Sequence, residues 1–138
     1  MKEITVDAVI GNIDRVTDLV NEELEALGCP MKAQAQIDVA IDEIFSNIVR
    51  YAYPGESGSV TVRYDCEDGL FSISFEDEGF HYNPLEKQDP DVSLPAEERK
   101  IGGLGIFLVK KTMDAMEYQR AGSRNILTLR KRIGDSGG

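Results

Sequence analysis

Two polar side chains, Glu43 and Asn47, are spaced four residues apart in a segment with apolar periodicity. Four residues make about one helical turn, so both side chains would share a helix face and could act on one ligand. An amide oxygen can coordinate a hard cation such as Mg²⁺, and a carboxylate can accept a proton from a hydroxyl group or from water. The alternative is a solvated helix face, because charged side chains are mostly exposed and Asp38, Asp42 and Arg50 are nearby.

A second candidate is Asp77, which ends an alternating apolar run and is followed by Gly79. A strand end would hold the carboxylate rigidly, and the glycine would let the backbone approach a ligand closely. In that position the carboxylate could accept a hydrogen bond from an exocyclic amine. An aspartate before a glycine is also a common turn signal, so both interpretations stay open.

The third candidate is the glycine-rich segment of Gly102, Gly103, Leu104 and Gly105, which opens an apolar helical pattern. Unpaired N–H groups and the helix dipole at such a start attract phosphate. The segment is not the dinucleotide-binding fingerprint, because a polar loop rather than a buried strand precedes it. Glycines before a helix can also form only a hinge.

Other reactive side chains give weaker signals. The single histidine, His81, lies in a polar stretch, and we expect an exposed loop residue rather than a base or a metal ligand. Cys29 and Cys66 lack metal-site spacing, so we expect two ordinary, partly buried thiols. Arg99 and Lys100, just before the glycines, could contact phosphate or form a solvated edge.

Apolar periodicity predicts the elements that position these residues. We expect a first helix that is capped by Asn12 and ended by Gly28 and Pro30. Residues 78–100 carry three prolines and no period, which predicts a long surface loop of the kind that often serves as a lid. The expected elements are, in order, a strand at 4–6, helices at 13–27 and 32–51, a hairpin at 60–64 and 70–75, a helix from 103, and a closing hairpin at 116–120 and 126–133. This order predicts an α+β fold with two layers.

Composition bounds the class of protein. The chain has 138 residues, 41% of them hydrophobic, which suits one domain over residues 1–133 and a disordered tail over 134–138. Its net charge of −10 argues against nonspecific nucleic-acid binding. It has no apolar run near the roughly 20 residues that a membrane helix needs, and no signal-peptide pattern, so we expect a cytoplasmic protein without membrane contact.

Together, the three candidate regions resemble in order and spacing the nucleotide boxes of the gyrase, chaperone and histidine-kinase ATPase superfamily. Within it, residues 42–53 and 102–114 look most like the bacterial anti-sigma regulatory serine/threonine kinases. The resemblance covers roughly residues 4–133. It implies a Bergerat-type fold, a two-layer sandwich in which helices cover one face of a mixed, mostly antiparallel sheet and ATP lies under a lid.

The resemblance also implies roles for individual residues. Asn47 would coordinate Mg²⁺, Asp77 would bind the adenine amino group, and Glu43 would be the general base that activates a partner's serine hydroxyl. Backbone at Gly79, Gly103 and Gly105 would approach adenine and phosphates. The nucleotide-binding residues implied are Asn47, Asp77, Gly79, Gly102, Gly103, Leu104, Gly105 and Thr128.

The implied function is that of an ATP-dependent protein serine kinase that sequesters a sigma factor. Phosphorylation of an anti-anti-sigma antagonist would switch it, and a homodimer is expected. A rival from another class is a binding module, an ATP-gated switch that grips partners without transferring phosphate. A third interpretation is slow ATP hydrolysis coupled to conformational change.

Three positions depart from the family pattern. His81 replaces a glycine often found two places after Gly79, and Tyr51 replaces a histidine common four residues after the asparagine. The threonine usually found near adenine on the closing strand is replaced by Asn125 or displaced to Thr128. These differences concern the adenine side of the site.

Overall fold

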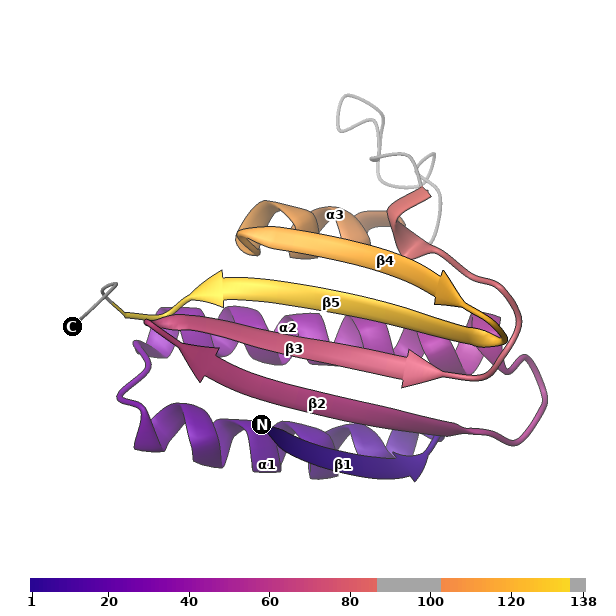
Figure 1. Ribbon diagram of the computed structural model, residues 1–138, viewed down its shortest axis with the longest axis horizontal. Coiled ribbons are helices and arrows are strands. Elements are labelled where there is room, and N and C mark those ends of the chain that lie inside the picture. The colour runs from indigo at the N-terminus through magenta and orange to yellow at the C-terminus, as the bar shows by residue number, and fades with distance from the viewer. Residues whose placement is uncertain (87–102, 135–138) are drawn as a thin grey trace.

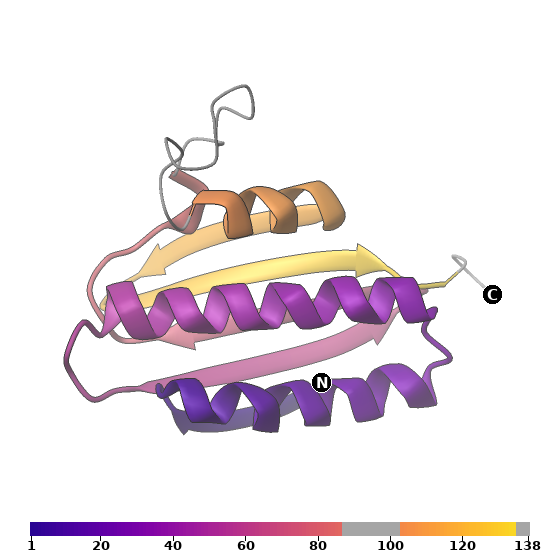
Figure 2. The ribbon, with the colours of Figure 1, turned by 180° about the vertical axis from the view of Figure 1, so that it is seen from behind.

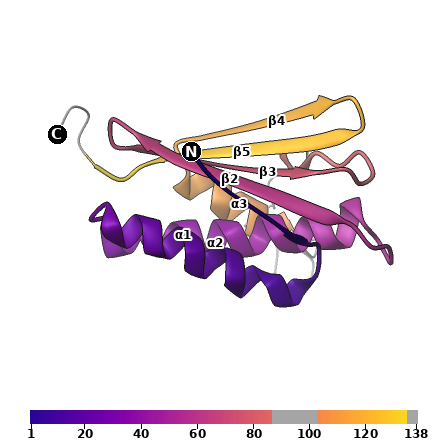
Figure 3. The same cartoon turned by 60° about the horizontal axis from the view of Figure 1, so that its bottom comes forward.

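The protein is built from a β-sheet and three helices that pack on one of its faces (Figure 1). The computed structural model describes residues 1–86 and 103–134. The elements are β1 (Lys2–Asp7), the 3₁₀ turn η1 (Ile10–Asn12), α1 (Ile13–Ala26), α2 (Met31–Asn47), the π-helical turn η2 (Ile48–Ala52), β2 (Ser59–Glu67), β3 (Leu70–Asp77), the 3₁₀ turn η3 (Pro84–Glu86), α3 (Gly103–Thr112), β4 (Ala115–Ala121) and β5 (Arg124–Arg132). Figure 2 shows the helical layer in front of the sheet, and Figure 3 shows the other sheet face uncovered.

The five strands lie in the order β1-β2-β3-β5-β4. All four neighbouring pairs of the described strands are antiparallel. The expected α+β sandwich is therefore confirmed, although this part of the chain holds no parallel pair and the sheet is not mixed. For β2–β3 and β4–β5 the cause is local, because short turns join these strands and only antiparallel strands can be joined by such turns.

The β2–β3 hairpin determines where Asp77 lies. Its turn residues Asp68 and Gly69 have φ angles of 52° and 78°, a conformation that suits the right-handed twist of a two-residue hairpin. Apolar side chains alternate along both strands and face the helices. The register pairs Val60, the second residue of β2, with Asp77 at the end of β3. The hairpin therefore brings Asp77 to its far end, as the sequence predicts.

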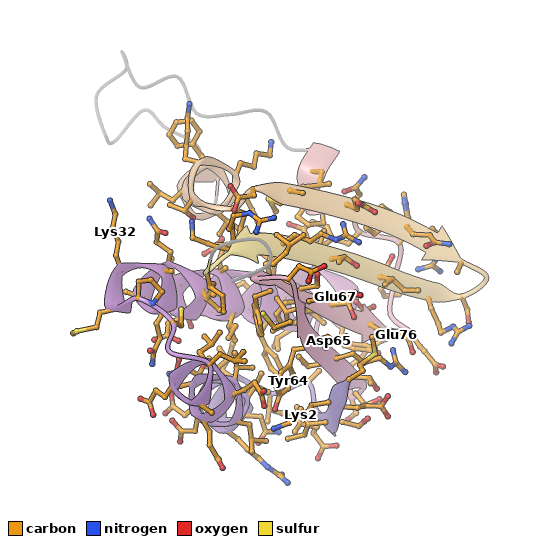
Figure 4. All side chains as sticks on the ribbon, turned by 60° about the vertical axis from the view of Figure 1, so that its left-hand side comes forward. Lys2, Lys32, Tyr64, Asp65, Glu67 and Glu76 are labelled. Atoms are coloured by element: carbon orange, nitrogen blue, oxygen red, sulfur yellow. The ribbon has the colours of Figure 1, made fainter. Side chains whose placement is uncertain are left out.

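The core fills the space between the sheet and the helices. Helix α1 buries Val16, Val20 and Leu24 completely, at the spacing expected for one helix face. Helix α2 buries its own stripe against the sheet, including Phe45. At one end of the sheet, Lys2 forms an ion pair with Glu23 of α1. In Figure 4, Lys2 and Tyr64 are labelled between the sheet and α1.

The ends of the first two helices differ in part from expectation. Gly28, with φ at +73°, follows the end of α1 as predicted. The prediction that the Asn12 side chain caps α1 is wrong, because its Nδ2 donates to the Asp7 carbonyl at 2.9 Å instead. Helix α2 stops at Asn47 and continues through Ala52 as a wider π-helical turn, a feature often found at functional sites.

The closing hairpin is confirmed as β4 and β5, with Gly122 at φ +62° in its turn. Most of the predicted surface loop, residues 87–100, and the tail residues 135–138 lie outside the described residues. Cys29 and Cys66 are free and partly buried, as expected. Among residues 1–86 and 103–134, no helix is long and apolar enough to cross a membrane.

Candidate nucleotide site

A small cavity of about 20 Å³ lies where the end of α2 meets the ends of β3 and β5. Its polar lining includes Asn47, Asp77 and Asn125, and its apolar lining comes from α2 and the sheet. The topology thus brings together two sequence-predicted residues, Asn47 and Asp77, that are thirty positions apart in the chain. This convergence of polar groups in an apolar pocket is what small-molecule sites have in common.

Asp77 is held rigidly at the end of β3 and is only 3% exposed. One of its carboxylate oxygens, Oδ1, accepts hydrogen bonds from the Gly79 amide and from Asn125 Nδ2, each at 2.9 Å. Burial raises the pKa of the Asp77 carboxyl, while these two donors and nearby Arg120 lower it to a smaller extent. The carboxylate is therefore oriented by its neighbours before any ligand binds.

Asn125 is one of the two positions that the sequence offered for the family's threonine, but its contacts with other segments could not be predicted. It pairs with Asp77 across β3 and β5, and its Nδ2 also donates to the Phe80 carbonyl at 2.8 Å. Its Oδ1 accepts from the Tyr118 hydroxyl and, at 3.0 Å, from Arg120. The Asn125 amide thus connects three segments and uses its hydrogen-bonding capacity within the protein.

Thr128 does not join this group. Side chains alternate along β5, so that Asn125, Leu127 and Leu129 are buried on the helix side of the sheet. Thr128 points the other way and lines a separate hollow on the uncovered face together with Ser74. Of the two positions considered for the family's threonine, the structure brings Asn125 to the cavity and leaves Thr128 outside it.

Asn47 carries an unused acceptor. Its side chain is 1% exposed, and its Oδ1 has no hydrogen-bond partner among residues 1–86 and 103–134. Its Nδ2 lies 3.4 Å from Glu43 Oε1, which is a long contact. A buried acceptor without a partner is costly, and an amide oxygen is a suitable ligand for a hard cation. The residue present therefore fits the Mg²⁺ role that the resemblance implies.

The described residues hold no group of three or more histidine, cysteine or acidic side chains able to bind a metal by themselves. Magnesium in nucleotide enzymes commonly takes only one or two protein ligands and completes its shell with phosphate oxygens and water. A single amide from Asn47 fits that kind of site better than a metal cage built from protein alone.

Glu43 is partly buried on α2 and packs against the first turn of α3. A Cβ atom added to Gly105 would lie 2.2 Å from the Glu43 carboxylate carbon. Gly103 begins α3, within the glycine-rich segment that was predicted to open a helix, whereas Gly102 and the Leu104 side chain lie outside the described part of the chain. The structure therefore brings Glu43, Asn47 and one of the predicted glycines to the same side of the site.

Gly79 has a structural reason to be glycine. A Cβ atom there would lie 2.3 Å from the carbonyl oxygen of Ala52, and the next amide, Phe80 N–H, donates to that oxygen at 2.8 Å. The backbone after β3 is thereby tied to the π-helical turn after α2. The sequence reasoning expected Gly79 to make room for a ligand, and it missed this contact because Ala52 is distant in the chain.

Aromatic residues line the cavity on the side of Tyr82. Tyr82 stacks on Tyr51 with ring centroids 4.8 Å apart, and Pro84 also lines the cavity. His81 is exposed, as expected, with its ring 5.7 Å from that of Tyr118. About 20 Å³ holds a single water molecule at most, so a nucleobase would not fit unless the lining of the cavity shifts.

Replacing Asp77 with asparagine is expected to reduce the pH dependence of stability in the nucleotide-free protein. Burial raises the pKa of Asp77 above its ordinary value of 3.8, so the folded state binds the proton more tightly than the unfolded chain. This contribution to stability is fully present below the unfolded-state pKa and is lost as the pH rises through the folded-state pKa. Urea unfolding from about pH 4 to 7 should show that the free energy of unfolding of the variant rises relative to that of the wild type as the pH rises. A difference that stays constant would contradict this assignment.

The sequence profile of the histidine kinase-like ATPase domain matches residues 6–131. The chain belongs to this family. Among curated relatives, this chain is 31% identical over 107 residues to "Serine-protein kinase RsbW" of Listeria monocytogenes. The match covers 73% of this chain and 68% of that protein. This chain is 29% identical over 94 residues to "Serine/threonine-protein kinase BtrW" of Bordetella bronchiseptica, covering 67% and 66% of the two chains. The resemblance stated from the sequence is confirmed.

Solved structures show the same fold for this ATPase domain. The histidine kinase domain of the blue-light activated histidine kinase from Erythrobacter litoralis matches with a TM-score of 0.58 at 16% identity. That match covers 90% of this chain, which spans 60% of the kinase domain chain. Acinetobacter baumannii histidine kinase AdeS matches with a TM-score of 0.52 at 14% identity, covering 98% of this chain and 69% of the other.

Proposed function

We propose that this protein is an ATP-dependent protein serine kinase that acts as an anti-sigma factor in a partner-switching system. The observation that supports it most directly is that the unpartnered Asn47 oxygen and the buried Asp77 carboxylate lie at the same cavity. In a domain of this ATPase family, these two acceptors suit the two ends of a magnesium-bound adenine nucleotide. The relatives named serine-protein kinases favour transfer to protein over simple binding.

The proposed roles follow from the positions of the side chains. The second oxygen of Asp77, Oδ2, would accept a hydrogen bond from the adenine amino group, because Oδ1 is already engaged. Asn47 would hold Mg²⁺, which when bound supplies positive charge near the transferring phosphoryl group. Glu43, four residues earlier on α2, would accept the proton of an attacking serine hydroxyl.

Phosphate would lie against the start of α3. The predicted contacts there are the backbone groups of Gly102, Gly103, Leu104 and Gly105, of which the first lies outside the described residues. A helix start carries unpaired N–H groups and a partial positive charge, and both favour phosphate. Thr128 is left out of this proposal because it lies on the uncovered sheet face.

The partners proposed are a sigma factor, which the protein would sequester, and an anti-anti-sigma antagonist, whose serine it would phosphorylate. Both come from the family resemblance, and the names of the relatives support the part of this proposal that concerns a serine kinase. The homodimer, the cytoplasmic location and the absence of direct nucleic-acid contact remain predictions. The net charge of −10 supports the last of these, since phosphates of nucleic acid would be repelled.

MgATP is expected to raise the thermal stability of the wild type, and this is the test of the proposed site. A ligand that binds only the folded state stabilises it by about 2.7 kcal/mol at a hundred times its dissociation constant. Differential scanning fluorimetry with increasing MgATP measures the effect. The Asp77→Asn variant should lose the shift, and Thr128→Ala on the uncovered face should keep it. If the Asp77→Asn variant keeps the shift in its unfolding midpoint, Asp77 does not contribute to nucleotide binding.

The closed cavity favours a second candidate, a binding module that grips its protein partners without transferring phosphate. A volume of about 20 Å³ leaves no room for adenine until the lining of the cavity shifts. If MgATP gives no shift in the wild type, this second function becomes the better explanation.

A further inference from the structure

The Glu43 carboxylate occupies the space that a side chain at position 105 would need. Helices α2 and α3 lie side by side on the sheet (Figure 2). The three heavy atoms nearest to a Cβ built on Gly105 all belong to the Glu43 carboxylate group, at 2.2, 2.2 and 2.4 Å. Real Cβ atoms do not approach other atoms so closely, so a side chain of any kind at position 105 would displace the carboxylate.

Gly105 is the third residue of α3, a position where glycine is unfavourable without a specific reason. Glycine inside a helix is less stable than alanine because the unfolded chain loses more freedom when it folds. No positive φ angle is recorded at Gly105 that would demand glycine. The close approach of the Glu43 carboxylate supplies the missing reason.

We propose that Gly105 is a positioning residue for Glu43, which holds the carboxylate in place by leaving room for it against the first turn of α3. This inference rests on the proposed kinase function. It adds a role for the missing side chain of Gly105 to the backbone contact with phosphate, which an alanine at this position would keep. The start of α3 favours a negative charge, so the carboxylate lies in a suitable electrostatic environment. On its other side, Asn47 Nδ2 lies 3.4 Å from Glu43 Oε1.

The consequence for catalysis concerns geometry. A glutamate side chain is long and loses rotamer freedom when it is fixed. A glutamate that acts as a general base therefore needs neighbouring atoms that restrict the position of its carboxylate. Here α2 carries the side chain, and the backbone of α3 at Gly105 is one of the surfaces that restrict it. A methyl group on Gly105 would displace the carboxylate by about an ångström, and misplacement of that size can slow a reaction by about a hundredfold.

The first test is a thermal double-mutant cycle that needs neither nucleotide nor partner. The atoms that a Cβ at position 105 would meet are the end of a flexible side chain that can move aside, so Gly105→Ala is expected to change the unfolding midpoint of the wild type little. In a Glu43→Ala background the same change should raise the midpoint by a few degrees, because no carboxylate has to move and alanine favours the helix. Gly11→Ala is the matched control, since a Cβ at Gly11 meets no atom within 4 Å. Equal changes in both backgrounds would overturn the contact.

The second test separates positioning of the base from phosphate binding. Gly105→Ala should keep the MgATP-induced shift in midpoint and the KM for ATP, while kcat for transfer of γ-labelled phosphate to an anti-anti-sigma protein falls by about a hundredfold. Loss of the MgATP shift in Gly105→Ala would instead assign the glycine to phosphate. A wild type with neither shift nor transfer would overturn the kinase function and the catalytic meaning of the contact, whereas the thermal cycle would still report on the contact itself.

Discussion

Glu43→Gln is expected to slow phosphoryl transfer by about 10²- to 10⁴-fold while MgATP affinity stays nearly unchanged. Glutamine has almost the same shape as glutamate, but its amide cannot accept the proton of a serine hydroxyl. Asn47 and Asp77, the proposed nucleotide contacts, remain in place in this variant. Transfer is measured with γ-labelled ATP and anti-anti-sigma proteins of the source organism as acceptors, and affinity by the MgATP-induced thermal shift.

The neighbouring acid Asp42 provides the matched control. It is exposed on the same helix, so Asp42→Asn removes one negative charge without reaching the site and should leave the transfer rate unchanged. Normal transfer by Glu43→Gln would show that Glu43 is not the base. Equal slowing in both variants would mean that the general charge of α2, and not proton acceptance, affects the reaction.

Asn125→Ala is expected to destabilise the fold by about 2 to 4 kcal/mol and to abolish the MgATP shift. The change leaves Asp77 Oδ1 with one donor fewer, and it leaves the Phe80 carbonyl without the 2.8 Å bond from Asn125. It also removes the acceptor for the Tyr118 hydroxyl and one acceptor for Arg120. Buried groups that lose their partners carry the full cost of having left water. Urea unfolding monitored by circular dichroism measures the loss.

Thr128→Ala tests whether the Asn125 effect is specific. Thr128 lies three residues further along β5 on the uncovered face, so its truncation removes a similar polar group from the same strand without touching Asp77. Its cost in free energy of unfolding should be about 0.5 kcal/mol or less, which is usual for surface substitutions. Comparable losses in the two variants would indicate a general effect of β5 and not the network around Asp77.

Local patterns in the sequence were sufficient for most of the elements and for the positions of three candidate site residues. The four-residue spacing places Glu43 and Asn47 on one side of α2, because a helix turn has nearly the same length in every protein. The alternating hairpin ends at Asp77 because a two-residue turn sets the register of both strands. Even so, local signals gave the wrong cap for α1, since Asn12 bonds instead to a strand residue five positions earlier.

Other features depend on residues that are far apart in the chain and that no local pattern joins. The choice between Asn125 and Thr128 was open from the sequence, because it depends on the pairing of β5 with β3, 48 positions earlier. Gly79 is explained by the carbonyl of Ala52, and Gly105 by the carboxylate of Glu43. The position of Tyr82 beside the cavity likewise follows from its stacking on Tyr51 of η2.

The sequence by itself determined that this chain is an α+β member of the histidine kinase-like ATPase family and which acidic and amide side chains are chemically suited to a nucleotide. Those properties follow from helix and strand periodicity and from the order of motifs along the chain. Only the tertiary structure decided which side of each strand faces the cavity, which glycines are required by neighbouring atoms, and how small the cavity is. The physical reason is that packing contacts join segments whose separation in sequence carries no information about their separation in space.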